Sequence, residues 1–316
     1  MDHQSTEVFL FGAAIADVVA QPFDPARLHD NSQSVRAVVL TVGGDALNEA
    51  TVLRRLGHGV TLRTTLGDDD AGMLVKAHLA REGVDLQTVT PPGLSTGVNV
   101  VLVQAGGERH FLTDPKGSLR RFSLEDALPA LDTPAFQSAR IATLASMFVS
   151  PQLDAEAMAE LFRHCRQAGK VVCADATRCK NGETAESVAC ALRELDWFFP
   201  NLDEARKLTG REQAEDVAEA LLSFGVRNLA LKMGSRGCLL ATGAGMAQVP
   251  AVPSVRAVDT TGAGDTFAAA FQAALLEGRP PRECAAFANA AASLCVEAVG
   301  ATRAGLDRAE IEARMG

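Results

Sequence analysis

The second half of the chain alternates between short apolar runs and longer amphipathic runs, and this alternation constrains the fold most. Runs typical of buried strands occupy residues 140–145, 171–175 and 228–233. The stretches around them have helical periodicity and cover residues 153–168, 185–195, 202–208, 214–224, 266–277 and 284–299. Strands and helices that alternate on this scale form parallel βαβ units with helices on both faces. We therefore predict an α/β fold with a doubly wound, mostly parallel sheet.

Two segments in the first half depart from this rhythm. Residues 15–42 are polar at first and end in a β-branched run, and residues 96–114 hold two β-rich runs around Gly106 and Gly107, which predicts a hairpin. We expect the two segments to form one small sheet that covers a site as a lid. The chain shows no internal repeat or linker, so we predict that residues 1–316 form a single domain.

The composition excludes several classes of function. The 39 acidic and 30 basic side chains give a net charge of −9, whereas a protein that binds nucleic acid normally carries a basic face. No apolar run approaches the length of a membrane span, and the first residues lack the basic stretch of a secretory signal. The seven cysteines are odd in number and show no CxxC spacing. We therefore expect buried, reduced thiols in a cytoplasmic protein with neither nucleic acid nor membrane as a partner.

Several catalytic motifs are absent from the sequence. It contains no GxxxxGK[ST] phosphate loop, no GxGxxG after the first predicted strand, no GxSxG and no HExxH. The six histidines also lack the spacing of metal ligands. We therefore do not expect a serine hydrolase or a zinc enzyme.

The strongest chemical signal is the string DTTGAGDTF at residues 259–267, which leads directly into an alanine-rich helical run. Gly262 and Gly264 allow the backbone to approach a ligand closely. A glycine turn that opens a helix presents free N–H groups and the positive end of the helix dipole, which together favour an anion. Asp265 has two interpretations: a helix N-cap, or a base that faces a phosphate held by the glycine amides.

This string closely resembles the second signature of the ribokinase-like (PfkB-type) sugar kinases. Further segments resemble other family motifs in the family's order: GGDALN at 43–48, GDDDAG at 67–72, NLDEARKLTG at 201–210, LKMGSRG at 231–237 and ANAAAS at 288–293. One short match arises easily by chance, whereas an ordered series does not. The resemblance implies a doubly wound α/β domain with a small β lid, and transfer of the ATP γ-phosphate to a hydroxymethyl-type alcohol.

The resemblance assigns the reaction to the glycine turn. Asp265 would be the base that takes the hydroxyl proton, because an alcohol is a weak nucleophile. The backbone N–H groups of Gly262, Ala263 and Gly264 would stabilise the charge of the migrating phosphoryl group.

Other matched positions would bind the nucleotide and its metal ion. Asn201 and Glu204 would organise Mg²⁺ and phosphate, with Glu204 acting through water, although the pair is also typical of an ordinary helix start. Lys232 either contacts the nucleotide or is a solvated lysine at a strand end. Asp259 either helps to hold a monovalent cation such as K⁺ or caps a turn. The remaining matches to the nucleotide pocket are Gly234, Gly237 and Asn289.

The family positions that contact the sugar are matched by Asp17, Gly43, Gly44 and Asn48. Carboxylate and amide groups suit a polyol because they bond several hydroxyl groups directionally. Ile15 stands where ribokinases proper carry an asparagine, so the resemblance does not specify ribose. Asn99, on the second irregular segment, either compensates for that change or is a surface residue.

A few cationic residues suggest an acidic acceptor. Arg178, in the string DATR, resembles part of a DxNxR element of some sugar-acid kinases, but threonine replaces the asparagine. Arg36, Arg109 and His110 are further candidates to meet an acid, although a solvated hairpin tip explains Arg109 equally well.

We therefore predict an ATP-dependent kinase of a small sugar or sugar acid that uses Mg²⁺, with K⁺ stimulation and a homodimer through the lid as additional expectations. A nucleoside kinase of the same family is one alternative, but the predicted lid offers only Phe23 and Phe111 to stack a base. A non-catalytic regulator on the same scaffold is the other. The intact Asp265, Asn201 and Glu204 argue against a regulator.

Overall fold

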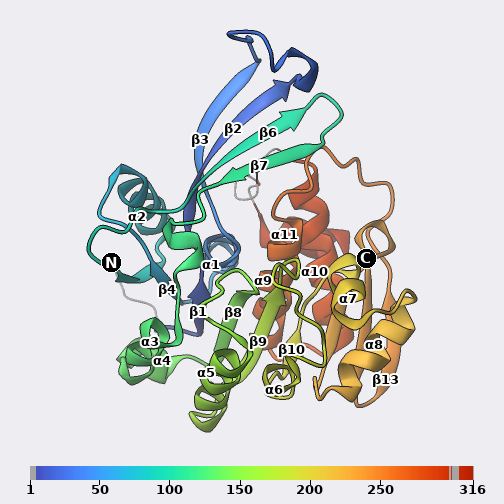
Figure 1. The fold of residues 1–316 in the computed structure, drawn as a ribbon. Helices are drawn as coiled ribbons and strands as arrows, with labels where there is room; N and C mark the ends of the chain where they lie inside the picture. Colours follow the sequence, from blue (N-terminus) through green and yellow to red (C-terminus); the bar gives the residue numbers. More distant parts are fainter. Residues whose placement is uncertain (1–4, 299, 301–305, 316) are drawn as a thin grey trace.

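The structure is a computed structural model that describes residues 5–298, 300 and 306–315. Within these residues, a nine-stranded sheet forms the centre of the main body (Figure 1). Its strands, in the order in which they pair, are β13 (Gly245–Val249), β12 (Cys238–Thr242), β11 (Leu229–Lys232), β10 (Trp197–Phe198), β9 (Val171–Ala176), β8 (Ile141–Met147), β1 (Val8–Gly12), β4 (Val60–Thr65) and β5 (Asp85–Val89). The strands from β11 to β5 are parallel, and β12 and β13 pair antiparallel at one edge. The predicted doubly wound, mostly parallel sheet is confirmed.

Alternate residues of β1 pack into two cores, one on each face of this sheet. Val8 and Leu10 belong to one core, and Phe9 and Phe11 belong to the other. A strand buried on both faces has to be apolar throughout, which explains the continuous apolar run. The helices that contribute to the first core are α1 (Asp45–Arg55), α2 (Asp70–Glu82), α9 (Ala263–Leu276), α10 (Pro281–Val296) and α11 (Arg308–Arg314). Those that contribute to the second are α3 (Leu124–Ala127), α4 (Pro134–Ser138), α5 (Ala155–Gln167), α6 (Ala189–Leu192), α7 (Leu202–Thr209) and α8 (Ala214–Ser223).

A separate four-stranded sheet projects from one end of the main body (Figure 1). Its strands, in the order in which they pair, are β3 (Ala37–Gly43), β2 (Ile15–Phe23), β6 (Val98–Gln104) and β7 (Arg109–Thr113). The two irregular segments of the sequence thus supply one sheet, with β6 and β7 as an antiparallel hairpin and β2 parallel to β6.

The register of the small sheet aligns one polar row on the face that also carries the apolar row Val39, Val19, Val101 and Phe111. One row across the four strands contains Thr41, Asp17, Asn99 and Thr113. The next row contains Leu40, Val18, Val100 and Leu112. Successive residues of a strand point to opposite faces, so the polar row lies on one face of the sheet and the apolar row that contains Leu40 lies on the other.

The structure also departs from the predicted elements. Residues 185–195, predicted as one helix, contain only the single turn α6, and the N–H of Ala185 donates to the carbonyl of Leu208 at the end of α7. The β12–β13 hairpin and α11 have no counterpart in the predicted elements. The described helices include none that is long and apolar enough to span a bilayer.

The seven cysteines are free thiols. Five are buried, but Cys179 and Cys190 are partly exposed, so the expectation of buried thiols is wrong for these two. Burial raises the pKa of Cys165 to about 12, which keeps this thiol protonated and unreactive.

Candidate active site

A cavity of about 650 Å³ lies between the small sheet and the carboxyl ends of the central parallel strands. Ala13, Val149 and Thr177, which follow β1, β8 and β9, line it from below, and the polar row of the small sheet lines it from above. Ligands of doubly wound sheets bind outside the carboxyl ends of the strands, so this is the expected place for a site.

Asp17 and Asn48 carry unsatisfied oxygens at one end of the cavity. Oδ1 of Asp17 and Oδ1 of Asn48 are buried and have no hydrogen-bond partner. Asn99 lies beside Asp17 on the neighbouring strand and accepts a hydrogen bond of 2.7 Å from Thr113. Buried oxygens without donors are costly, and the hydroxyl groups of a polyol would supply the missing donors.

Gly43 and Gly44 make room for this end of the site. A Cβ at Gly43 would lie 2.0 Å from Oδ2 of Asp17, and one at Gly44 would lie 2.5 Å from the carbonyl oxygen of Ala13. Gly44 also has a φ of 97°, in a region that disfavours side chains. The structure thus places all five predicted sugar-contacting residues along one cavity wall, with Asn99 inside the site and not on the surface.

Asp265 lies in the first turn of α9 and faces the same cavity. Nδ2 of Asn48 donates to its Oδ2 at 2.7 Å. Burial is the main cause that raises its pKa well above the ordinary value, and the charges of Asp45 and Asp175 add to the shift. The N-cap of α9 is Gly262, so the N-cap interpretation of Asp265 is wrong.

The glycine turn opens α9 next to this carboxylate. Gly262 has a left-handed φ of 73°, which favours glycine, and the N–H of Ala263 makes a long bond of 3.3 Å to the carbonyl of Thr260. A Cβ at Gly264 would lie 3.2 Å from Nζ of Lys232, so glycine leaves the approach to that ammonium open. The first N–H groups of a helix have no intrahelical acceptor, so the turn can bind an anion here.

Lys232 is an ion-pair partner beneath the site. Its Nζ lies 2.7 and 2.9 Å from the two carboxylate oxygens of Asp175, and its side chain is only 11% exposed. Burial opposes the ammonium form, but the charges of Asp175 and Glu204 outweigh burial and raise its pKa. The interpretation as a solvated lysine is therefore wrong.

Asn201 and Glu204 form a capping box at the start of α7. Oδ1 of Asn201 accepts from the N–H of Glu204 at 2.9 Å, and Oε2 of Glu204 accepts from the N–H of Asn201 at 3.0 Å. Burial first, then the charge of Asp175, raises the pKa of Glu204 to about 7. The helix-start interpretation is confirmed, and Glu204 also lines the cavity.

All five predicted nucleotide residues, Asn201, Lys232, Gly234, Gly237 and Asn289, lie outside the described cavity lining. A Cβ at Gly237 would lie 2.2 Å from the carbonyl oxygen of Val249, and Nδ2 of Asn289 donates to the same carbonyl at 3.1 Å. Gly234 has a positive φ of 60° at the turn before β12. Gly237 and Asn289 thus meet at the end of β13, beyond the cavity.

The carboxylate of Asp259 forms an ion pair and accepts several hydrogen bonds. It pairs with Arg109 of β7 and accepts from both the N–H and the hydroxyl of Thr261 and from the N–H of Gly300. Burial pushes its pKa upward, but these hydrogen bonds and the Arg109 charge outweigh burial and lower it. The turn-capping interpretation is confirmed. No three acidic, histidine or cysteine side chains converge as a metal site in the described part of the chain.

Of the four cationic residues predicted to bind an acidic acceptor, two line the cavity and two do not. Arg178 and Arg109 line the cavity, but Arg109 is held by Asp259. His110 is exposed and bonds Gln104, and Arg36 does not contribute to the described lining.

Sequence reasoning missed Asp45, Arg120 and Lys180, all of which line the cavity. Asp45 opens α1 and is bonded by the hydroxyl of Ser146. Its place inside the GGDALN motif was the available signal. The other two have no local signal because folding alone brings their loops to the site.

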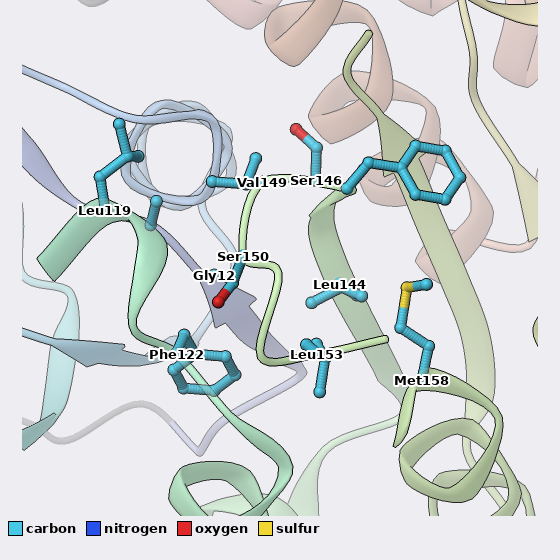
Figure 2. Close-up of a pocket in the computed structure, with 11 residues that line it drawn as sticks. Gly12, Leu119, Phe122, Leu144, Ser146, Val149, Ser150, Leu153 and Met158 are labelled. Atoms are coloured by element: carbon cyan, nitrogen blue, oxygen red, sulfur yellow. The ribbon is translucent and has the colours of Figure 1, made fainter. Parts of the chain in front are cut away.

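A second, smaller space of about 20 Å³ lies below the end of β8 (Figure 2). Figure 2 shows Leu144, Leu153, Phe122 and Met158 around it. Its size suits one water molecule, and its apolar lining does not suit a sugar.

Comparison with known proteins places these residues in context. Residues 5–308 match the pfkB family of carbohydrate kinases. The chain is 28% identical over 322 residues to a ribokinase of Arabidopsis thaliana, covering 98% of this chain and 81% of the relative. It is 27% identical over 300 residues to a 2-dehydro-3-deoxygluconokinase of Bacillus subtilis, covering 92% and 89%.

A solved structure shares the fold along its whole length. The A. thaliana ribokinase, complexed with ribose and ATP, has a TM-score of 0.80 and is 26% identical, with 99% of each chain covered.

Proposed function

Because this chain belongs to the pfkB family of carbohydrate kinases, we propose that it transfers the γ-phosphate of ATP to a hydroxyl group of a small sugar or sugar acid. The observation that carries the proposal is the placement of Asp265 between the unsatisfied acceptor-side oxygens and the glycine turn. The relative complexed with ribose and ATP supports ATP as the phosphate donor.

Asp265 would act as the general base. Its ionised carboxylate takes the hydroxyl proton while the acceptor oxygen bonds to the γ-phosphorus, and the bond from that phosphorus to the bridging oxygen of the departing ADP breaks. Its raised pKa makes the ionised group a stronger base. Asn48 orients the carboxylate through its 2.7 Å hydrogen bond.

The glycine turn would stabilise the transferring phosphoryl group. Gly262, Ala263 and Gly264 direct backbone N–H groups to the space in front of α9, where fixed dipoles stabilise developing negative charge. Lys232 adds a cation behind Gly264.

The acids around the site support a requirement for Mg²⁺. The charges of Asp45 and Asp175 raise the pKa values of Glu204 and Asp265, so a polyphosphate meets strong local repulsion. Glu204 would hold Mg²⁺ through water, since Mg²⁺ keeps several waters and uses few protein carboxylates. Bound Mg²⁺ would neutralise charge on the phosphates.

K⁺ is not part of the proposal. Oδ1 of Asp259 is taken by Arg109 and Thr261, and Oδ2 accepts only the N–H of Gly300, so a monovalent cation would have to bind at Oδ2.

The alternative functions find less support in the cavity. Phe111 is the one aromatic side chain in its described lining, which is a small surface on which to stack a nucleobase. The unsatisfied oxygens of Asp17 and Asn48 suit the hydroxyl groups of a sugar better.

Replacing Asp265 tests the proposal against a non-catalytic regulator. We expect Asp265→Asn to lower kcat for phosphoryl transfer by roughly 10²–10⁴-fold, measured as ADP release. The variant should fold with an unchanged or higher Tm because it removes a charge beside like charges. Asp203→Asn, whose side chain is 85% exposed on α7, is the matched control. A full rate in Asp265→Asn, or no transfer by the native chain to any sugar or sugar acid, would refute the function.

A further inference from the structure

Three cationic side chains line the cavity without an ion pair to any described residue. Arg120 ends a short 3₁₀ turn below the small sheet, and Arg178 and Lys180 lie on the loop that follows β9. None of the three forms an ion pair or a side-chain hydrogen bond with the described residues. Arg109, the other cation of the lining, is paired with Asp259.

These three charges gather on one wall. Burial is the first cause that lowers the pKa of Lys180, and the charges of Arg120 and Arg178 lower it further, although the charges of Asp45 and Glu183 oppose the shift. Like charges that are close enough to perturb one another favour an anion between them. The positive charge of this wall is therefore not neutralised by a direct ion pair with any described carboxylate.

The position of the wall favours the acceptor over the nucleotide. Asp17, Asn48 and Asn99 line the same cavity as the three cations. Along the sheet, β9 stands between β8 and β1 on one side and β10 and β11 on the other; Asn201 lies three residues after β10, and Lys232 ends β11. Arg120 follows Leu119, which lies against Gly97 just before β6, so this turn adjoins the small sheet that carries Asp17 and Asn99.

We propose that the acceptor carries an oxyanion, a carboxylate or a phosphate ester, which Arg120, Arg178 and Lys180 bind while Asp17, Asn48 and Asn99 bind its hydroxyl groups. This inference rests on the proposed kinase function and narrows its substrate class. A guanidinium group binds an oxyanion through two parallel hydrogen bonds, and a neutral sugar offers no group that needs three cations.

The first arm of the test compares three acceptors by ADP release: 2-dehydro-3-deoxygluconate with a carboxylate, ribose 1-phosphate with a phosphate, and neutral ribose. We expect one of the two anionic acceptors to exceed ribose in kcat/KM by at least about 100-fold, the effect of roughly two charge-assisted contacts. The preferred anion distinguishes the carboxylate from the phosphate ester.

The second arm removes the cations. Arg178→Gln and Lys180→Gln should each raise the KM of the preferred acceptor by about tenfold or more and leave the KM of ATP within about twofold. Arg163→Gln, a half-exposed arginine on α5, is the matched control. A larger rise in the KM of ATP than of the acceptor would overturn the inference, because the cations would then serve the nucleotide.

A third arm separates this inference from the kinase function. Calorimetry with Asp265→Asn measures acceptor binding without turnover, and binding of the preferred anion should weaken in the Asp265→Asn/Arg178→Gln double variant. Preference for ribose over both anions overturns the inference but leaves the kinase function standing. Arg178-dependent binding of an anion, with no phosphoryl transfer by the native chain, supports the inference and refutes the function.

Discussion

At the scale of single residues, Asp17 shows how the site trades stability for binding. Desolvation by burial, the main cause, raises its pKa to about 6, while a hydrogen bond with Asn99 opposes the rise. Its Oδ1 has no hydrogen-bond partner. Its carboxylate packs so closely against Gly43 of β3 that no larger residue fits there. Groups kept at such a cost in a cavity are candidates for function.

The pH dependence of stability tests this reading of Asp17. Between pH 4 and pH 6 the folded state holds more protons at this group than the unfolded state, so its contribution to the free energy of unfolding falls as pH rises. We expect Asp17→Asn to raise Tm at pH 8, where the buried charge is present, and to leave Tm unchanged below pH 4.

The same variant, Asp17→Asn, should bind the acceptor more weakly although it is more stable at pH 8. Asp17→Asn should raise the KM of the acceptor by roughly tenfold or more and leave the KM of ATP unchanged, as for the loss of a charged hydrogen-bond acceptor. Asp203→Asn is again the exposed control. Equal effects on the two KM values, or a Tm difference that does not vary with pH, would contradict the assignment.

At the scale of elements, one ion pair joins the small sheet to the glycine turn. Arg109 belongs to β7, and its partner Asp259 lies three residues before Gly262. The pair is mostly buried, with side-chain exposures of 22% and 12%. We propose that the small sheet acts as a lid and that this contact holds the lid against the turn.

Breaking the ion pair should loosen the lid. In Arg109→Gln we expect faster amide hydrogen exchange in residues 98–113, with exchange in β8 and β9 unchanged, because opening of the small sheet does not require opening of the core. The KM of the acceptor should rise several-fold.

A double-mutant cycle with Asp259→Asn shows whether the effect arises from the pair. The two single variants and the double variant should behave alike if the contact is responsible. Additive effects, or no change in exchange for Arg109→Gln, would refute the role of the contact.

At the scale of the whole molecule, a net charge of −9 has to be reconciled with a polyanionic substrate. For the proposed phosphate donor, the site offers backbone N–H groups and the buried Lys232, among several acids. In the proposed reaction, ATP recognition would therefore be local and would depend on a divalent cation to offset the surrounding carboxylates.

Removal of Mg²⁺ should abolish turnover. We expect excess EDTA to reduce ADP release to background and Mg²⁺ to restore it, whereas raising NaCl from 50 to 200 mM should change the KM of ATP by less than about threefold, because surface charges are not the main contacts. Full activity in EDTA, or a steep dependence on salt, would contradict this account.

The outer face of the small sheet is a candidate dimer interface. Val38, Leu40 and Leu112 are 67%, 62% and 58% exposed, and the register aligns Leu40 and Leu112 in the apolar row on the face opposite Asp17. Exposed apolar patches commonly mark interaction sites, so we propose that two chains pair through this face.

Light scattering coupled to size-exclusion chromatography checks the assembly. The native chain should elute as a dimer, and Leu40→Asp should elute as a monomer because a charge in an apolar interface is costly. Met73→Asp, an exposed apolar residue on α2, is the matched control and should remain dimeric. A monomeric native chain would refute the interface.

Local patterns determined much of this protein. Continuous apolar runs and helical periodicity predicted most strands and most helices, since a strand buried on both faces has to be apolar and a covering helix has to be amphipathic. Short spacings placed Gly262, Ala263, Gly264 and Asp265 in one turn, and Asn201 and Glu204 in another. The β12–β13 hairpin was missed although Gly243 lies in its turn and Gly245 begins its second strand.

Tertiary structure alone decided which distant residues meet. Asn48 and Asp265 are 217 positions apart, and Arg109 and Asp259 are 150 apart. Lys232 became a buried partner of Asp175, and Arg120 joined Arg178 and Lys180, because the ends of several strands converge on one cavity. Sequence spacing determines which functional groups lie within one turn. The partner that sets the charge of a side chain, such as Asp175 for Lys232, belongs to another element, and only tertiary packing brings the two together.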